Sequence, residues 1–233
     1  MIDPYSKAVA VIPARGGSKG IPKKNLLQIG GRPLIEWTLE AVVEATNAFR
    51  LIVSTDSQEI SQVSRDMGAE IVVRPEELGL DTTATEPVIS HALAQLGIEG
   101  NTCLVILQAT SPIRSSGTLD SAYETFLSSG SDSLLAVVEE APFLWRGPVS
   151  NPTATYNVAY RPRRQDFKPN AIIYKEVGSF YFSWVESFQS TGNRIHGRQQ
   201  LFVVDKHEGI DIDDDYDAIM ADAILSKRGS GSK

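Results

Sequence analysis

Apolar runs rich in β-branched residues alternate with amphipathic stretches along much of the chain, and this alternation strongly limits the folds it can adopt. Short apolar runs bounded by polar turns are typical of strands, and apolar residues spaced three or four apart are typical of helices. Strand-like runs lie at residues 8–12, 51–54, 70–73, 103–107 and 133–138, and helical patterns at residues 33–45, 58–67, 86–96 and 119–127. The pattern predicts a three-layer α/β fold, in which a mainly parallel sheet has helices on both faces.

The alternation stops after Val138. Between about residues 142 and 176 the chain mixes prolines, aromatic residues and basic residues without a helical period. Strand-like sequences resume with GSFYFS and LFVVD, and a last helix is predicted at residues 214–225. We therefore expect a single domain, residues 1–233, with an arm of loops or short strands inserted at about residues 142–176.

Composition narrows the class of protein. The chain of 233 residues has a net charge of −7, which argues against general binding to nucleic acid. It has no apolar run of about 18 residues and no signal-peptide pattern, so no membrane partner is predicted. A lone Cys103 inside an apolar run cannot form an internal disulfide, which fits a reducing, cytoplasmic location.

A basic, glycine-rich loop follows the first strand-like run. Its sequence is ARGGSKGIPKKN, residues 14–25, and it holds four cations in an acidic chain. It is not a P-loop, because Lys19 precedes Gly20 and neither Ser nor Thr follows. Its glycines also lack the G-x-G-x-x-G spacing of a dinucleotide loop. A solvated basic loop is the plainer alternative, but the position at a strand end favours a triphosphate site.

The segment GIDIDDDYDA supplies the candidate metal ligands. Asp211 and Asp213 flank Ile212, so both carboxylates face one side if the segment is extended. Paired carboxylates with phosphate oxygens and waters suit Mg²⁺. An EF-hand fits poorly, because its sixth position is Tyr216 and its twelfth is Asp222. The neighbouring acids Asp214, Asp215 and Asp217 are assigned instead to capping the last helix.

Three further segments carry polar residues with two possible roles. VVRPEELGLDTTAT follows one strand-like run, and its threonines either bind a ligand or start the helix that contains Glu86-Pro87. LQATSPIR spans the end of another run, and its alternative is an ordinary turn at Pro112. The third, YRPRRQDFK in the arm, is a candidate anion site with a nucleic-acid patch as its alternative.

These segments together identify a resemblance. ARGGSKGIPKKN, GGRPLIEWTLEA, VSTDSQEI, VVRPEELGLDTTAT, QATSPIR, RPRRQDF, GSFYF and GIDIDDDYDA resemble motifs of the CMP-sialic acid synthetases, also called acylneuraminate cytidylyltransferases, in the order of that family. The likeness covers nearly the whole chain. It implies a Rossmann-like nucleotidyltransferase fold whose inserted arm makes a homodimer.

The resemblance also implies a reaction. CTP and an acidic nine-carbon 2-keto-3-deoxy sugar, a nonulosonic acid, would give a CMP-sugar and pyrophosphate when the anomeric 2-hydroxyl attacks the α-phosphate. Such a displacement needs positioning and charge neutralisation more than covalent catalysis. Mg²⁺ is the implied cofactor, with Mn²⁺ able to substitute. No side chain is assigned as the general base.

The implied site residues fall into four groups. Those nearest the chemistry are Lys24, Arg15 and Asp211. The nucleotide-binding group is Arg15, Ser18, Lys19, Lys24, Asn25, Arg74, Thr82, Thr83 and Thr85. The acceptor-binding group is Gln108, Thr110, Ser111 and Arg114, with Arg163, Arg164 and Gln165 reaching across a subunit interface. The metal ligands are Asp211 and Asp213.

One position departs from the family pattern. The family usually has Asn before the glycine of the GSFYF segment, and this chain has Val177. The lost amide leaves sialic, legionaminic, pseudaminic and deaminated acids open as the acceptor. The alternative functions are a nucleotidyltransferase for another sugar acid and a nucleotide-binding regulator without catalysis.

Overall fold

The computed structural model describes residues 8–18, 20–47, 49–141, 143–167 and 171–229. These residues form a seven-stranded sheet in the order β11-β7-β10-β6-β1-β4-β5. Every neighbouring pair is parallel except those made by β10, which runs antiparallel to β6 and β7. The bounds are β1 Ala8–Pro13, β4 Arg50–Thr55, β5 Glu70–Val73, β6 Cys103–Leu107, β7 Ser133–Glu140, β10 Ile173–Trp184 and β11 Gln199–Val203. The predicted mainly parallel sheet is confirmed.

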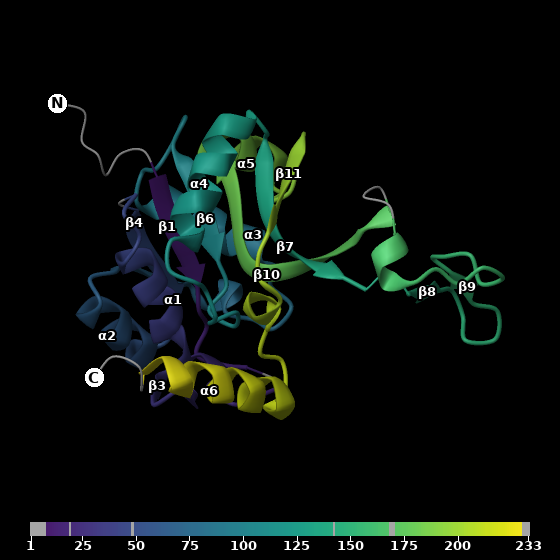
Figure 1. The fold of residues 1–233 in the computed structure, drawn as a ribbon. Coiled ribbons are helices and arrows are strands. Elements are labelled where there is room, and N and C mark those ends of the chain that lie inside the picture. Colours follow the sequence, from purple (N-terminus) through teal and green to yellow (C-terminus); the bar gives the residue numbers. More distant parts are fainter. Residues whose placement is uncertain (1–7, 19, 48, 142, 168–170, 230–233) are drawn as a thin grey trace.

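Helices cover both faces of the sheet (Figure 1). One face packs against α1 (Leu34–Val43), α2 (Gln58–Asp66) and α4 (Thr118–Ser129), and the other against α3 (Thr85–Gln95) and α5 (Val185–Thr191). All residues of β6 are buried, which explains its continuous apolar sequence. The predicted helices are confirmed to within a few residues at their ends, whereas α5 has no counterpart in the sequence prediction.

A third apolar cluster lies beside the carboxyl edge of the sheet. The hairpin of β2 (Gln28–Ile29) and β3 (Arg32–Pro33) packs there against the last helix, α6 (Asp215–Gly229). Ile212 is fully buried in this cluster. Its burial anchors the segment carrying the paired aspartates next to the loop that follows β1.

The inserted segment forms a protruding arm (Figure 1). Strands β7 and β10 continue as a ladder up to the pair Glu140 and Ile173, and the arm then adds a hairpin of β8 (Trp145–Arg146) and β9 (Thr153–Ala154). Phe143 packs edge-on against Tyr156 and Phe167, so the arm has its own small aromatic core.

Short 3₁₀ helices among the described residues also connect these elements: η2 (Lys24–Leu26), η3 (Glu76–Leu78), η4 (Arg164–Asp166) and η6 (Lys206–Gly209). Within the described ranges, no helix has both the length and the hydrophobicity that crossing a bilayer requires.

Candidate active site

The basic loop after β1 folds against α2 and the Asp213 segment. The Gly16 amide donates to Asp56 Oδ1 at 2.7 Å, and a Cβ on Gly16 would lie only 2.9 Å from that of Ser57. At the other end of the loop, a Cβ on Gly20 would lie 2.8 Å from the Asp213 carbonyl oxygen. Glycine is therefore needed at both points because the loop backbone lies in close contact with its neighbours.

The described cations of this loop each face a carboxylate. Arg15 pairs with Asp81, and Lys23 donates to both oxygens of Glu59 at 2.8 and 2.9 Å. Lys24 donates to the Ile212 carbonyl and lies 3.3 Å from Asp213 Oδ1. The predicted ligand Lys19 lies outside the described residues, and Ser18 is half-buried.

Many of the predicted nucleotide ligands line one cavity of about 270 Å³. Its walls include the predicted nucleotide ligands Arg15, Asn25, Arg74, Thr83 and Thr85, together with the predicted acceptor ligands Gln108 and Thr110. Asn25 comes from the 3₁₀ turn at Lys24–Leu26 and Thr83 from the loop before α3. The others follow the ends of β1, β5 and β6 or start α3, at the edge where α/β sheets bind ligands. The exposed Thr82 does not line this cavity.

Hydrogen bonds to the backbone hold several of these side chains in place. Arg74 is 7% exposed and donates to the Ser54 carbonyl at 2.8 Å. Burial lowers the pKa of its guanidinium, and the Asp56 carboxylate opposes that shift. The Asn25 amide donates to the Arg15 carbonyl at 2.9 Å, and Thr83 to the Glu77 carbonyl at 3.2 Å. Bonds within the protein thus hold these three side chains at the cavity.

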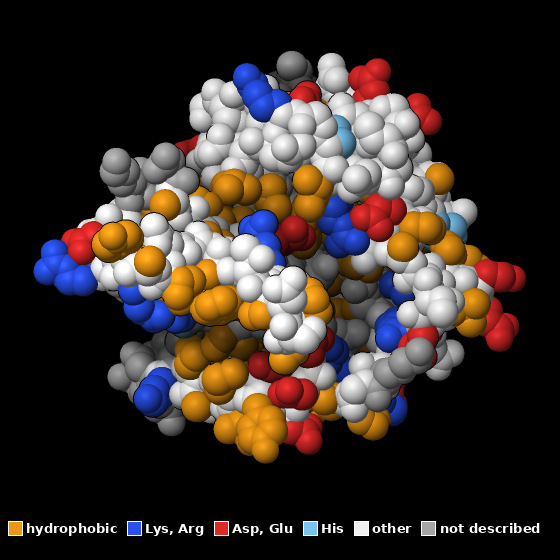
Figure 2. All heavy atoms as spheres, turned by 90° about the vertical axis from the view of Figure 1, so that its right-hand side faces the viewer, with side chains coloured by type: hydrophobic (Ala, Val, Ile, Leu, Met, Phe, Trp, Pro, Cys, Tyr) orange, Lys and Arg blue, Asp and Glu red, His pale blue; other side chains and the backbone are white. Residues whose placement is uncertain are grey.

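A second cavity, of about 420 Å³, contains the paired aspartates. Asp211 and Asp213 both line it, together with Asp217 and residues 175–178 of β10. Ser111 donates to Asp211 Oδ1 at 3.4 Å. Figure 2 shows basic and acidic side chains together in the hollow beside the arm. The alternation around Ile212 therefore places both carboxylates at one cavity, as expected for a metal-binding pair.

The remaining acids of this segment cap α6. Asp214 Oδ1 accepts hydrogen bonds from the amides of Tyr216 and Asp217 at 2.9 and 3.0 Å. Asp217 Oδ2 accepts from the amides of Asp213 and Asp214 at 3.0 and 3.2 Å. The capping role predicted for Asp214 and Asp217 is confirmed, and Asp215 lies in the first turn.

Arg114 lies inside the protein rather than at either cavity of the candidate site. Its guanidinium donates to Thr38 Oγ1 at 2.9 Å and to the carbonyls of Gln108 and Ser179 at 3.1 and 2.6 Å. Burial lowers its pKa to about 10, against the opposing field of Glu208 and Asp211. It ties the end of β6 to β10, so its observed contacts are those of a supporting residue. Direct contact with the acceptor stays a prediction.

Gln108 packs against the backbone of β10. A Cβ added to Gly178 would overlap Gln108 Oε1 and lie 3.4 Å from Ser111 Oγ. The neighbouring Val177 is 4% exposed and packs against Gly209. The glycine of the GSFYF segment thus makes room for the Gln108 side chain.

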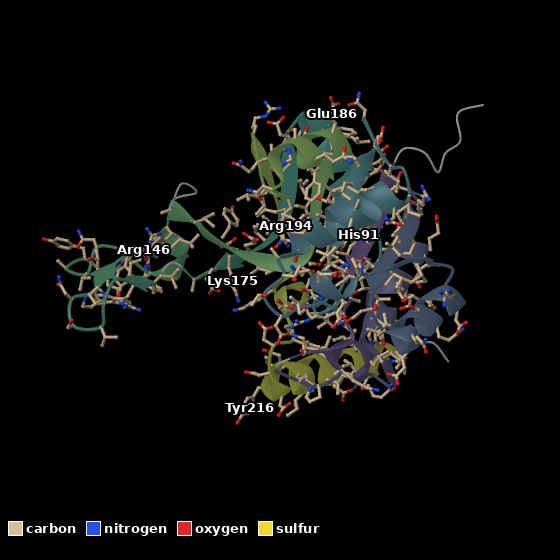
Figure 3. All side chains as sticks on the ribbon, turned by 180° about the vertical axis from the view of Figure 1, so that it is seen from behind. His91, Arg146, Lys175, Glu186, Arg194 and Tyr216 are labelled. Carbon is tan, nitrogen blue, oxygen red and sulfur yellow. The ribbon has the colours of Figure 1, made fainter. Side chains whose placement is uncertain are left out.

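The predicted arm residues lie away from these cavities. Arg163 is exposed and donates to Asp166 Oδ2 at 2.7 Å, and Gln165 is exposed. Arg164 lies in η4, and its side chain is outside the described set. Figures 1 and 3 both show the arm directed away from the body, so the structure does not bring these residues to the site of their own chain.

The sequence prediction missed a polar cluster, of which Glu176 lines the second cavity. Arg194 Nε donates to Glu86 Oε1 at 2.6 Å, and its guanidinium lies 5.1 Å from the centre of the Tyr181 ring. The Tyr181 hydroxyl donates to Glu176 Oε1 at 2.7 Å. Glu86 and Arg194 are 108 positions apart, and no local pattern links them.

The chain resembles known proteins over most of its length. Residues 9–215 match the family model described as cytidylyltransferase. N-acylneuraminate cytidylyltransferase A of Danio rerio is 35% identical over 226 residues, covering 94% of this chain and 51% of that protein. The N-acylneuraminate cytidylyltransferase of Escherichia coli O18:K1:H7 (strain RS218 / NMEC) is 29% identical over 227 residues, covering 96% and 53%. The chain thus spans about half the length of these curated relatives.

Two solved structures share the fold. The structure of CMP:2-keto-3-deoxy-manno-octonic acid synthetase complexed with CTP superposes with a TM-score of 0.70 at 15% identity, covering 95% of this chain and 99% of that one. The crystal structure of 4-diphosphocytidyl-2C-methyl-D-erythritol synthase gives a TM-score of 0.68 at 15% identity, covering 94% and 98%. Since the family model matches most of its length, this chain belongs to the cytidylyltransferase family.

Proposed function

We propose that the protein transfers CMP from CTP to the anomeric 2-hydroxyl of a nonulosonic acid, releasing pyrophosphate. The main support for this proposal is that the two cavities are adjacent, with one hydrogen bond joining the segments that line them. The Ile212 amide donates to the Thr110 carbonyl at 2.8 Å. Thr110 lines the first cavity, and the aspartates on either side of Ile212 line the second. A nucleotide in the first cavity would thus direct its phosphates toward the paired carboxylates.

The cations of the basic loop bind the triphosphate in this proposal. Arg15 lines the nucleotide cavity, and Lys24 borders the paired aspartates. When CTP binds, Arg15 and Lys24 would each leave a carboxylate partner and donate to phosphate oxygens instead. Such hydrogen bonds are strong because both partners are charged. As the 2-hydroxyl oxygen bonds to the α-phosphorus, the bond to the bridging oxygen breaks, pyrophosphate leaves and the hydroxyl proton is released. Lys24 stabilises the charge that develops at this phosphate.

Asp211 and Asp213 would hold the metal. Their donor atoms are carboxylate oxygens at one cavity, and hard oxygen donors are the ligands that Mg²⁺ prefers. When bound, Mg²⁺ neutralises charge on the phosphate oxygens and the leaving pyrophosphate. The residues present therefore fit the Mg²⁺ dependence that the sequence predicts.

The arm is proposed to complete the site of a second copy in a homodimer. Its exposed apolar side chains include Trp145, Val149 and Tyr160, which are 53%, 99% and 82% exposed in the single chain. A protruding surface of this kind is typical of a protein interface. Arg163, Arg164 and Gln165 would then meet the acceptor carboxylate or the pyrophosphate of the partner, because an arginine fork pairs well with such anions.

Pyrophosphate release tests the proposal directly. The purified protein is incubated with CTP, Mg²⁺ and each acid of a nonulosonic panel, with ATP, GTP and UTP as nucleotide controls. Release with CTP and one acid is expected, and it would identify the acceptor that Val177 accommodates. CTP binding without turnover on any acid would overturn the proposal in favour of a regulator or another acceptor class.

A further inference from the structure

We propose that Glu208 is a positioning residue for the proposed reaction and acts through the guanidinium of Arg114. It supplies the buried negative charge that holds Arg114 against the end of β6 and the middle of β10, and Arg114 in turn holds Gln108 at the nucleotide cavity. The inference rests on the proposed function and deepens it, since Glu208 itself lines neither cavity of the candidate site.

Glu208 is an acid inside the protein. It is 2% exposed and lies in η6. A Cβ on the next residue, Gly209, would lie 2.8 Å from Val138 Cγ1 and 3.2 Å from Val177 Cγ1, so this turn is packed tightly against β7 and β10. Val177 lies two positions after Lys175, which Figure 3 shows where the arm leaves the body. The backbone that carries Glu208 is therefore held in place by the fold.

The Glu208 carboxylate needs a positive partner. Thr118 Oγ1 donates to Glu208 Oε2 at 3.3 Å, which is long for a hydrogen bond from a hydroxyl. Burying a carboxylate costs free energy unless a positive charge compensates for it. Arg114, four positions before Thr118, is 5% exposed and provides that charge. Burial lowers the pKa of its guanidinium, and Glu208 opposes this shift more strongly than Asp211 does.

Arg114 connects this charge to the candidate site. Its guanidinium donates to the Gln108 carbonyl at 3.1 Å and to the Ser179 carbonyl at 2.6 Å. The Gln108 side chain lines the nucleotide cavity and packs against Gly178. If Glu208 were neutral, the buried guanidinium would lose its main counter-charge, and this link between β6 and β10 would loosen.

Asp211 cannot take over this task in the proposed reaction. It also opposes the burial of Arg114, but it lines the second cavity and is a proposed metal ligand. A cation bound to Asp211 would cancel much of the aspartate's field at Arg114, because the two charges have opposite signs and lie close together. Glu208 would then remain as the counter-charge of the guanidinium.

A metal-binding role is the alternative for Glu208. Asp205 and His207 lie beside it in the sequence, and one donor atom from each of the three side chains lies within 4.8 Å of the others. The positive field of Arg114 favours the positioning role, because it would repel a bound cation. Asp205→Asn and His207→Gln separate the two roles, since each removes a donor atom of the alternative site and leaves Glu208 in place.

The affinity for CTP, measured by calorimetry in the presence of Mg²⁺, tests the inference. Glu208→Gln should raise the Kd for CTP by about 10-fold, the effect of losing one hydrogen bond in the nucleotide cavity. Glu208→Asp keeps the charge and should raise the Kd less. The matched controls, Asp205→Asn and His207→Gln, should stay within about twofold of the natural chain. An unchanged Kd in folded Glu208→Gln, or an equal rise in the controls, would overturn the inference.

Combining Glu208→Gln with Arg114→Gln shows whether the glutamate acts through the arginine. If it does, the double variant should bind CTP no more weakly than Arg114→Gln alone. It should also melt at a higher temperature than either single variant, because each single variant leaves one buried charge uncompensated and the double variant removes both. Additive losses of affinity would overturn the inference. If Glu208→Gln does not fold, Glu208→Asp takes its place in the same comparison.

CTP binding needs no acceptor, so these measurements separate the inference from the proposed function. Coupling between Glu208 and Arg114 in CTP affinity, without pyrophosphate release on any acid, would support the positioning role and overturn the proposed reaction. Pyrophosphate release by a chain whose CTP affinity is insensitive to Glu208 would do the reverse. If the natural chain does not bind CTP, both proposals fail.

Discussion

The Lys24 ammonium lies 3.3 Å from Asp213 Oδ1 and donates to the carbonyl of the residue between the two candidate metal ligands. The lysine side chain is 14% exposed and the aspartate 79% exposed, so the cation is held at the rim of the second cavity while the carboxylate remains open. The group expected to bind phosphate thus contacts the group expected to bind the metal. Substrate and metal would separate these charges and make each available to the reaction.

Asp211→Ala is expected to abolish Mg²⁺-dependent turnover while leaving the fold intact. The carboxylate lines the open cavity, and its one hydrogen bond from Ser111 is long at 3.4 Å. Its removal breaks no short hydrogen bond, and Glu208 still opposes the buried charge of Arg114, so the fold should persist. Mg²⁺ titration of the rate and a thermal melt are the measurements, with Asp215→Ala on the exposed start of α6 as the control. Near-normal activity with a native melt would contradict the metal assignment.

Much of the fold could be predicted because buried parallel strands leave a strong local signal. The residues of β6 are all buried and read as one continuous apolar run. The seven-residue helix α5 was missed because it is too short to show a helical period. Most of the first half of β10 was also missed, since Lys175 and Glu176 are exposed at the root of the arm and interrupt the apolar pattern.

The site could be predicted where its residues are neighbours in the sequence. Asp211 and Asp213 are two positions apart, so their shared direction followed from the backbone alone. The contact between Lys24 and Asp213 spans 189 positions, and only the fold brings them together. Arg114 illustrates the converse. Its segment resembles a family motif, but the sequence does not show that its guanidinium is turned into the interior.

Mixing two inactive chains tests whether the arm acts in trans. Lys24→Ala disables the body, and Arg164→Ala disables the arm. If the arm completes the partner's site, a heterodimer contains one site with both residues intact, so each heterodimer should regain about half of the natural activity. A random mixture of equal amounts, in which about half of the dimers are mixed, should regain about a quarter. Pyrophosphate release is compared before and after subunit exchange. Heterodimers shown to form without regaining activity would contradict a shared site.

Asp120 is expected to make stability depend on pH. Burial opposes its ionisation, but hydrogen bonds from the Asn47 and Thr46 amides at 2.7 and 2.9 Å outweigh it and lower its pKa. A carboxyl with a lowered folded pKa contributes stability above its unfolded pKa, about 3.9, and loses it as pH falls through the folded value. Asp120→Asn should therefore cost about 1 kcal/mol at pH 7, reduced by solvent screening, and progressively less toward pH 3. Urea unfolding at both pH values measures the difference, and a constant difference would contradict this role.

Gly178→Ala is expected to lower turnover through Gln108 rather than through the fold. The added Cβ would overlap Gln108 Oε1, which is the far end of a flexible side chain and can move aside. The thermal melt should then shift by only a few degrees, whereas Gln108 would leave its place in the nucleotide cavity and kcat/KM for CTP should fall by about 10-fold or more.

A double-mutant cycle tests whether Gly178→Ala acts through Gln108. If Gly178→Ala acts by displacing Gln108, adding it to Gln108→Ala should reduce kcat/KM no further, because the displaced group is already gone. Independent, additive losses would instead mean that the alanine distorts β10 itself. Arg114 would then be the sensitive point, since it binds the carbonyls of both Gln108 and Ser179 and a shift of β10 would break that connection. In that case the melting temperature of Gly178→Ala should also fall. The buried Arg114 guanidinium would lose a hydrogen-bond acceptor, and a buried charge without its partner is strongly destabilising.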